Sequence, residues 1–208
     1  ALGCEVAVPT VPGSGRAPLS QGMIDTATTK AEGVTEALAP YVADGYDVVV
    51  IEPSDLAMFR GDYERLLPES AFEPLAENSY EIIEYAYGLL ANGAEADALS
   101  TGDGEPVAYH SHCQQRTMGL EEYTLAVFEE CGYEVATSDV ECCGMAGSFG
   151  YKEQYYDLAM DVGSNLEGQL REMESDRVIA SGTSCTDQIG DLLGEEPAHP
   201  VELLAPSP

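Results

Sequence analysis

The stretch Val140–Gly150 reads VECCGMAGSFG and places two adjacent cysteines, Cys142 and Cys143, among glycines. Adjacent Cα atoms lie about 3.8 Å apart, which is below the usual range for a disulfide. A bond between these two thiols would be strained, so metal or redox chemistry explains the pair better. Two neighbouring thiolates can instead bind different atoms of one metal cluster. Gly144 and the glycines after it let the backbone come close to the sulfurs and turn amide N–H groups toward them.

Two further cysteines, Cys113 and Cys185, each follow a short apolar segment with the pattern of a strand. In a parallel α/β sheet the carboxyl ends of the strands gather at one edge, where ligand sites form. Four thiolates are the common set of ligands for an iron–sulfur cluster. The sequence therefore predicts a metal centre held by Cys113, Cys142, Cys143 and Cys185.

Other interpretations of these thiols stay open. Four thiolates also suit structural zinc, although such sites normally use CxxC pairs, which this sequence lacks. Cys142 and Cys143 could also form a strained, strongly oxidising disulfide. A buried pair without any ligand is the simplest alternative.

Several neighbours of these cysteines could support a metal centre. The segment 109–113 reads YHSHC, and its two histidines, His110 and His112, could bind or hydrogen-bond the metal. The competing interpretation is that they cap the next helix. We expect His112, Gly144 and Arg116 to lie next to the ligands, with the Arg116 guanidinium offsetting negative charge.

The remaining cysteines and the third histidine have simpler interpretations. We expect Cys4 and Cys131 to be small core residues. His199, which precedes Pro200, is expected to begin a final strand.

Strand and helix patterns alternate along the chain, which indicates βαβ units on a mostly parallel sheet. Strands are expected at residues 5–8, 47–51, 107–109, 134–137 and 177–180, and helices at residues 23–42, 70–90, 115–130 and 153–173.

An internal repeat relates the two halves of the chain. The segment GCEV at residues 3–6 matches GYEV at residues 132–135. Ten residues after the glycine that opens each segment, the first copy has Gly13-Ser14-Gly15 where the second has Cys142-Cys143-Gly144. Later in the first copy, Asp55 stands where the second has Cys185. Only the second copy therefore keeps its thiols.

The repeat predicts two tandem Rossmann-like units. We expect residues 1–93 to be a degenerate first copy with a helical extension, residues 94–105 a linker, and residues 106–208 the second copy with the cysteines. The second copy has a strand, a cysteine and a helix before residue 132 that the first lacks. By this analogy we expect roughly 25 or more residues upstream of Ala1.

The charge balance excludes some classes of partner. Asp and Glu number 38 against 8 Lys and Arg, a net charge of −30, so nucleic acid is not an expected partner. The acids are scattered, which is typical of a halophilic surface that salt screens. No apolar run reaches membrane-spanning length, and we expect no secretory leader.

Recognisable catalytic and nucleotide-binding motifs are missing from the sequence. It contains no GxGxxG, GxSxG, HExxH or Walker-type GK[ST] segment. We therefore assign no catalytic residue and expect that this chain does not transform a substrate by itself.

The cysteine segments resemble the cysteine-rich CCG domain family. The matching segments are HSHC at 110–113, ECCGMAGSFG at 141–150, GTSC at 182–185 and HPVELL at 199–204. This family includes a subunit of heterodisulfide reductase and the iron–sulfur parts of glycolate oxidase, FAD-linked D-lactate dehydrogenase and anaerobic glycerol-3-phosphate dehydrogenase. Two departures matter. The first copy has Gly13, Ser14 and Asp55 where family members with two intact copies carry cysteines, and Gly182 stands where the fullest family motif, CxxC, has its first cysteine.

The resemblance implies electron transfer. It predicts one 4Fe–4S cluster in the second copy, with FAD elsewhere in a longer protein that oxidises a 2-hydroxy acid of the D-lactate or glycolate type. Electrons would pass from a flavin-containing domain or subunit toward quinone or another carrier, in the cytoplasm or at the cytoplasmic face of the membrane. A docking module with zinc or no metal, and the iron–sulfur subunit of an anaerobic glycerol-3-phosphate dehydrogenase, are the alternatives.

Overall fold

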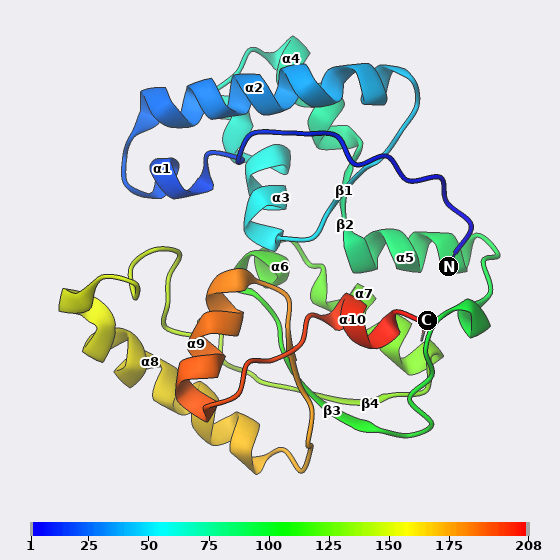
Figure 1. The fold of residues 1–208 in the computed structure, drawn as a ribbon, viewed down its shortest axis with the longest axis vertical. Coiled ribbons are helices and arrows are strands. Elements are labelled where there is room, and N and C mark those ends of the chain that lie inside the picture. The colour runs from blue at the N-terminus through cyan, green and yellow to red at the C-terminus, as the bar shows by residue number, and fades with distance from the viewer. Residues whose placement is uncertain (1, 207–208) are drawn as a thin grey trace. The chain divides into compact units, whose positions relative to one another are not determined.

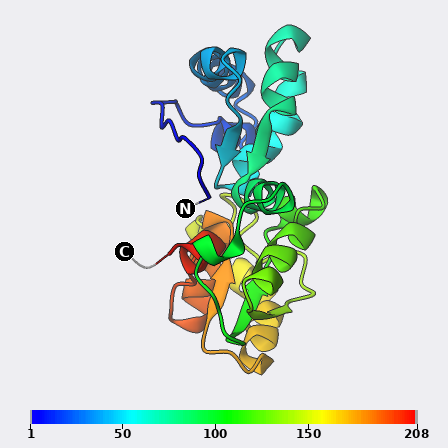
Figure 2. The same cartoon turned by 90° about the vertical axis from the view of Figure 1, so that its right-hand side faces the viewer.

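The computed structural model describes residues 2–206, which form two compact units (Figures 1 and 2). The first unit is residues 5–82, and the second combines residues 2–4 with residues 83–206. The predicted linker at residues 94–105 stays a prediction. Within the described residues, no helix is both long and apolar enough to cross a membrane.

The smaller unit is mostly helical and contains a two-stranded parallel sheet. Strand β1 (Val48–Val50) pairs with β2 (Ser79–Glu81), with Val49 opposite Tyr80. The helices are α1 (Arg16–Ser20), α2 (Ile24–Ala43), α3 (Pro53–Arg60), the 3-10 helix η1 (Asp62–Arg65) and α4 (Glu69–Glu77). The predicted helix at residues 23–42 is confirmed by α2.

Two predictions in the smaller unit are wrong. Residues 5–8 form no strand, and Val6 and Val8 are 77% and 90% exposed. Alternating valines favour a strand, but this segment does not pair with another strand in the described structure. The helix predicted at residues 70–90 is split into α4, β2 and α5 (Ile82–Ala91). Residues 79–81 pair with β1, and this tertiary pairing overrides the local helical pattern.

The larger unit is built on a three-stranded parallel sheet in the order β4-β3-β5. The strands are β3 (Pro106–His110), β4 (Glu134–Thr137) and β5 (Val178–Ala180), close to the predicted ranges. The 3-10 helix η2 (Ala96–Ala98) precedes the sheet, and the helices that follow are α6 (Cys113–Thr117), α7 (Glu121–Glu130), α8 (Glu153–Glu172), α9 (Thr183–Leu193) and α10 (Pro200–Leu204). Helix α8 packs along α9, and α7 packs against β4 (Figure 1). The protein is therefore of the α/β class.

Local details of the larger unit correct three further predictions. The helix expected at residues 115–130 is broken between α6 and α7, where Gly119 has a left-handed φ of 70°. His199 does not begin a strand; its side chain accepts a hydrogen bond from the Val201 N–H at the start of α10. Cys4 is exposed and is not a core residue, because the segment around it forms no strand. Cys131 is 2% exposed, which confirms its place in the core.

Candidate metal centre

Three buried donors converge at the carboxyl end of the sheet in the larger unit. A ring nitrogen of His110 and the sulfurs of Cys143 and Cys185 all lie within 4.8 Å of one another. Their exposed fractions are 0%, 4% and 2%. Imidazole and thiol groups held this close, away from water, form a donor set suited to a metal centre.

The parallel sheet explains why residues so far apart in sequence meet. His110 is the last residue of β3 and pairs with Ala180, the last residue of β5. Cys185 follows β5 as the third residue of α9. Cys143 lies in the loop that follows β4. All three donors therefore follow or end strands at one edge of the sheet, where parallel α/β folds place their ligands.

Residues 138–152, which connect β4 to α8 and carry Cys142 and Cys143, form the cysteine loop. This loop has an unusual backbone. Gly144, Ala146 and Gly147 have φ values of 104°, 46° and 65°. A left-handed φ is rare for alanine, and such strain gathers at functional sites. The turn directs the N–H groups of Gly144 and Ala146 to the Cys142 sulfur and that of Met145 to the Cys143 sulfur. N–H donors at sulfur stabilise the thiolate form that a metal needs.

Close packing explains why Gly144 is a glycine. A Cβ built there would lie 2.3 Å from the carbonyl oxygen of Ala159 and 3.1 Å from the nitrogen of Gly163. Both contacts belong to α8, so the cysteine loop lies directly on the backbone of that helix. Because residue 144 has no side chain, the loop can pack against α8 and hold Cys142 and Cys143 in their observed positions.

The thiols of the cysteine loop hold their protons strongly. A hydrogen bond with Cys143, followed by burial, raises the pKa of Cys142 well above its usual range, while the N–H groups of Gly144 and Ala146 act in the opposite direction. The hydrogen bond with Cys142 lowers the pKa of Cys143, but a hydrogen bond with Cys185 and burial outweigh it and raise this pKa to about 12. A bound cation would reverse this balance, because a coordinating thiol is deprotonated.

His110 is held in a defined orientation. Its Nδ1 lies 2.8 Å from the Ser138 hydroxyl oxygen, in the residue directly after β4. Its Nε2 is buried and has no hydrogen-bond partner among the described residues. Burial lowers the pKa of His110 to about 3, and the charges of Arg116 and His112 contribute to this lowering. His110 is therefore a neutral imidazole with one nitrogen available.

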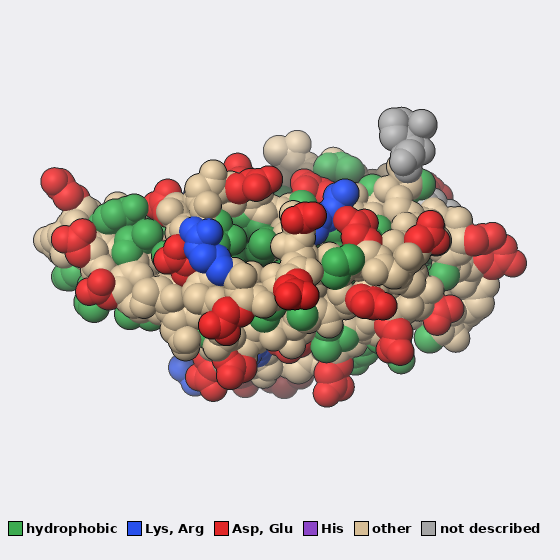
Figure 3. Space-filling model, turned by 90° about the horizontal axis from the view of Figure 1, so that it is seen from below, with side chains coloured by type: hydrophobic (Ala, Val, Ile, Leu, Met, Phe, Trp, Pro, Cys, Tyr) green, Lys and Arg blue, Asp and Glu red, His purple; other side chains and the backbone are tan. Residues whose placement is uncertain are grey.

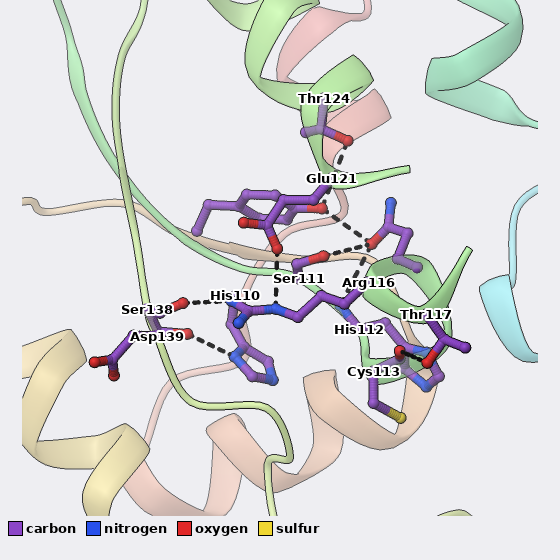
Figure 4. A network of polar contacts seen from close by, with 12 residues as sticks. His110, Ser111, His112, Cys113, Arg116, Thr117, Glu121, Thr124, Ser138 and Asp139 are labelled. Atoms are coloured by element: carbon purple, nitrogen blue, oxygen red, sulfur yellow. Dashed lines mark hydrogen bonds and ion pairs between the residues drawn. The ribbon is translucent and has the colours of Figure 1, made fainter. Parts of the chain in front are cut away.

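A second layer of polar contacts supports the residues around His110, as Figure 4 shows. Arg116 donates a hydrogen bond to the carbonyl oxygen of Ser138, and its Nε lies 2.9 Å from a carboxylate oxygen of Glu121. Arg116 thus ties α6 to the loop after β4 and to α7. Its charge is already paired with a carboxylate, and a role in offsetting the charge of a metal centre stays a prediction.

His112 and Cys113 lie at the start of α6. The Nδ1 of His112 accepts a hydrogen bond from the Gln114 N–H at 3.1 Å, so His112 caps this helix, as one of the two sequence interpretations predicted. The half-buried Cys113 is the first residue of α6. Its sulfur lies outside the group of three close donors.

The structure thus brings together part of the predicted set and adds one residue. Cys143 and Cys185 converge, and Cys142 joins them through its hydrogen bond with Cys143. His110 was one of two histidines that the sequence offered as ligands, and no sequence signal favoured it over His112. The signal that distinguishes them is position: His110 ends a strand, whereas His112 begins a helix.

The residues of this candidate metal centre lie in a segment that is similar to known proteins. Residues 107–190 match the family model of a cysteine-rich domain, CCG. One subunit of the anaerobic glycerol-3-phosphate dehydrogenase of Escherichia coli (strain K12) is 34% identical over 100 residues, which cover 48% of this chain and 25% of the relative.

Two longer matches cover almost the whole chain. D-2-hydroxyglutarate dehydrogenase of Escherichia coli (strain K12) is 24% identical over 196 residues, and its counterpart in Pantoea ananatis (strain AJ13355) is 24% identical over 194 residues. Each match covers 92% of this chain and 18% of the relative. The chain therefore spans a quarter or less of the length of these curated relatives. The resemblance to the CCG family seen in the sequence is confirmed over residues 107–190, the segment that matches the family model.

Proposed function

We propose that the chain is the electron-transfer domain of a flavin-linked dehydrogenase that oxidises a 2-hydroxy acid. The observation that carries this proposal is the buried convergence of Cys143 and Cys185 with His110 at the carboxyl end of the sheet. An iron–sulfur cluster bound there, of the 4Fe–4S type, would supply one-electron transfer.

The ligands in this proposal are Cys113, Cys142, Cys143 and Cys185. The backbone N–H groups of the cysteine loop already point at two of these sulfurs, and such hydrogen bonds adjust the potential of a cluster. Burial of Cys143 and Cys185 keeps water away from the site, which strengthens these interactions. The residues present therefore fit the group that the family resemblance implies.

The relatives favour a 2-hydroxy acid as the substrate class. The two D-2-hydroxyglutarate dehydrogenases match 92% of the chain, whereas the glycerol-3-phosphate dehydrogenase subunit matches 48% at higher identity. A flavin-containing domain or subunit is the expected electron donor, with FAD bound outside this chain. Quinone or another carrier is the expected acceptor. Glycerol 3-phosphate is the alternative substrate.

We also propose that residues 5–82 are a copy of the same architecture without its thiols. Helices α2 and α8 each have 20 residues, and each is followed by a short strand and then a helix. A Cβ at Gly15, where φ is 89°, would lie 3.0 Å from the carbonyl oxygen of Ala27 in α2. This contact is the counterpart of the one between Gly144 and Ala159 in α8.

Polar side chains stand in the smaller unit where the larger unit has thiols. Asp55 is the third residue of α3, as Cys185 is of α9. Ser14 donates a hydrogen bond to Asp55 at 2.5 Å, and the Ser14 carbonyl accepts one from the Tyr63 hydroxyl at 2.7 Å. A serine–aspartate pair here supports the proposal that the first copy retains the scaffold and binds no cluster.

The substrate class can be tested in the full-length protein, purified without oxygen in high salt. Addition of D-2-hydroxyglutarate or D-lactate should bleach the visible absorption of the cluster, and glycerol 3-phosphate should not. The Cys185→Ser variant should still reduce an artificial acceptor at the flavin while losing the cluster signal. Bleaching by glycerol 3-phosphate alone would assign the chain to the alternative enzyme class.

A zinc-bearing docking module is the second candidate function. The observation in its favour is that the three close donors, two thiols and one imidazole, could all bind a single ion, and zinc accepts this combination. Such a module would join the flavin-containing part to a partner without carrying electrons. Metal analysis separates the two functions, because only the first requires iron and acid-labile sulfide.

A further inference from the structure

We propose that His110 Nε2 is an iron ligand of the cluster and takes the place of a cysteine that the chain lacks at Gly182. This inference rests on the proposed function and names a residue of the same site. It adds one histidine to the four cysteines of the proposed ligand set.

The position of His110 is the first argument. Its side chain is fully buried, and a ring nitrogen lies within 4.8 Å of both Cys143 Sγ and Cys185 Sγ. The residue ends the central strand β3: His110 itself pairs with Ala180 of β5, and the preceding Tyr109 pairs with both β4 and β5. A rigid strand places a ligand more precisely than a loop does.

The orientation of the ring is the second argument. A metal-binding histidine usually uses its other nitrogen in a hydrogen bond, which fixes the ring and its tautomer. Here Nδ1 lies 2.8 Å from the Ser138 hydroxyl. Ser138 is in turn held through its carbonyl oxygen by Arg116. Nε2 is left as a buried polar atom with no hydrogen bond among residues 2–206, an arrangement that costs stability unless a ligand fills it.

Gly182 supplies the third argument. A Cβ built at this residue would lie 2.2 Å from Cδ2 and 2.9 Å from Cγ of the His112 ring. The His112 ring therefore occupies the space into which a cysteine side chain at residue 182 would extend. His112 is also committed to capping α6 through its Nδ1. A donor in place of that cysteine would therefore come from another residue, and among the described residues His110 is the buried histidine that lies close to the two sulfurs.

The exchange of a thiolate for an imidazole has an electronic consequence. A neutral histidine contributes no negative charge to the cluster, and replacement of cysteine by histidine raises the reduction potential in Rieske centres. The chain should therefore hold a cluster of higher potential than an all-cysteine version of the same site.

Isotope labelling tests this ligand directly. The 208-residue chain contains three histidines, so it can be prepared without oxygen with ¹⁴N- or ¹⁵N-histidine and examined by pulsed EPR in its paramagnetic state. We expect a strong nitrogen coupling that changes with the isotope. Mössbauer spectra of ⁵⁷Fe protein should show one iron with a nitrogen ligand, also in the diamagnetic state.

Three variants assign the coupling to one residue. His110→Cys should keep iron and sulfide, lose the nitrogen coupling and shift the midpoint potential to a lower value. His112→Asn and His199→Asn should keep the coupling, because asparagine preserves both helix caps. An iron-loaded chain without the coupling, or a coupling that survives His110→Cys, overturns this inference alone. A chain with zinc or no metal overturns both this inference and the proposed function.

Discussion

The sulfurs of Cys143 and Cys185 lie within 4.8 Å of each other and of a ring nitrogen of His110, although the three residues come from a loop, a helix and a strand. The carboxyl edge of the β4-β3-β5 sheet is what brings them together. A metal centre at this edge therefore depends both on the thiols themselves and on the packing that holds the cysteine loop in place.

Removal of one buried thiol should empty the site. We expect Cys185→Ser to lower bound iron by at least about tenfold, because loss of a ligand costs no less than loss of a supporting hydrogen bond. Iron and sulfide analysis of the anaerobically purified variant measures this effect. Cys4→Ser is the matched control, since Cys4 is exposed and outside the site. Equal iron in both variants would contradict the assignment of Cys185.

Gly144 should be far less tolerant of a side chain than Gly147. We expect Gly144→Ala to lower the free energy of unfolding by about 2–4 kcal/mol, because the methyl group meets the backbone of α8 at a positive φ. At Gly147, φ is 65° but a Cβ would meet nothing within 4 Å, so alanine should cost about 1 kcal/mol. Urea unfolding of both variants compares them. Similar losses would mean that close packing on α8 does not set the position of the loop.

The sequence predicted much of the larger unit because its strands are short apolar segments bounded by turns. It also predicted that Cys113, Cys142, Cys143 and Cys185 follow strands. The sheet edge brings the sulfurs of Cys143 and Cys185 together, whereas the Cys113 sulfur lies outside this group. It could not choose between His110 and His112, since that choice depends on where β3 ends and α6 begins. It failed at residues 79–81 because pairing with β1 is a long-range contact that local periodicity does not contain. The exposed Cys4 was misplaced for a related reason, because the expected strand found no partner.

The smaller unit should show a pH dependence that originates at Asp55. Burial raises the pKa of this carboxyl above its ordinary value, and Glu52 adds to the rise, while hydrogen bonding from Ser14 and the charge of Arg16 oppose it. Between the ordinary and the raised pKa, the folded chain holds more protons than the unfolded chain. The free energy of unfolding contributed by this group therefore falls as the pH rises through that window.

We expect Asp55→Asn to remove this decline, because asparagine carries no titrating charge and can still accept the hydrogen bond from Ser14. Urea unfolding between about pH 4 and about pH 7 measures the slope in the wild type and the variant. Asp44→Asn is the control, since Asp44 is exposed. If the pH dependence of Asp55→Asn equals that of the wild type, the buried carboxyl does not contribute to it.

The acidic surface should make stability depend on salt. Acidic side chains are spread over the face shown in Figure 3, with few basic ones among them, in keeping with the net charge of −30. Raising the salt concentration from about 0.1 M to about 1 M shortens the Debye length from about 10 Å to about 3 Å and screens this repulsion. We expect the midpoint of thermal unfolding to rise over this range with both sodium and potassium chloride. An unchanged or lower midpoint would contradict a halophilic surface.

An iron–sulfur cluster held by the buried thiols can be tested by direct analysis. Iron, acid-labile sulfide and zinc should be measured on protein purified without oxygen in high salt, with EPR spectra recorded before and after dithionite. We expect iron and sulfide together with an EPR signal that changes on reduction. Zinc without iron, or protein that binds neither metal, would contradict the cluster and leave the domain as a docking module.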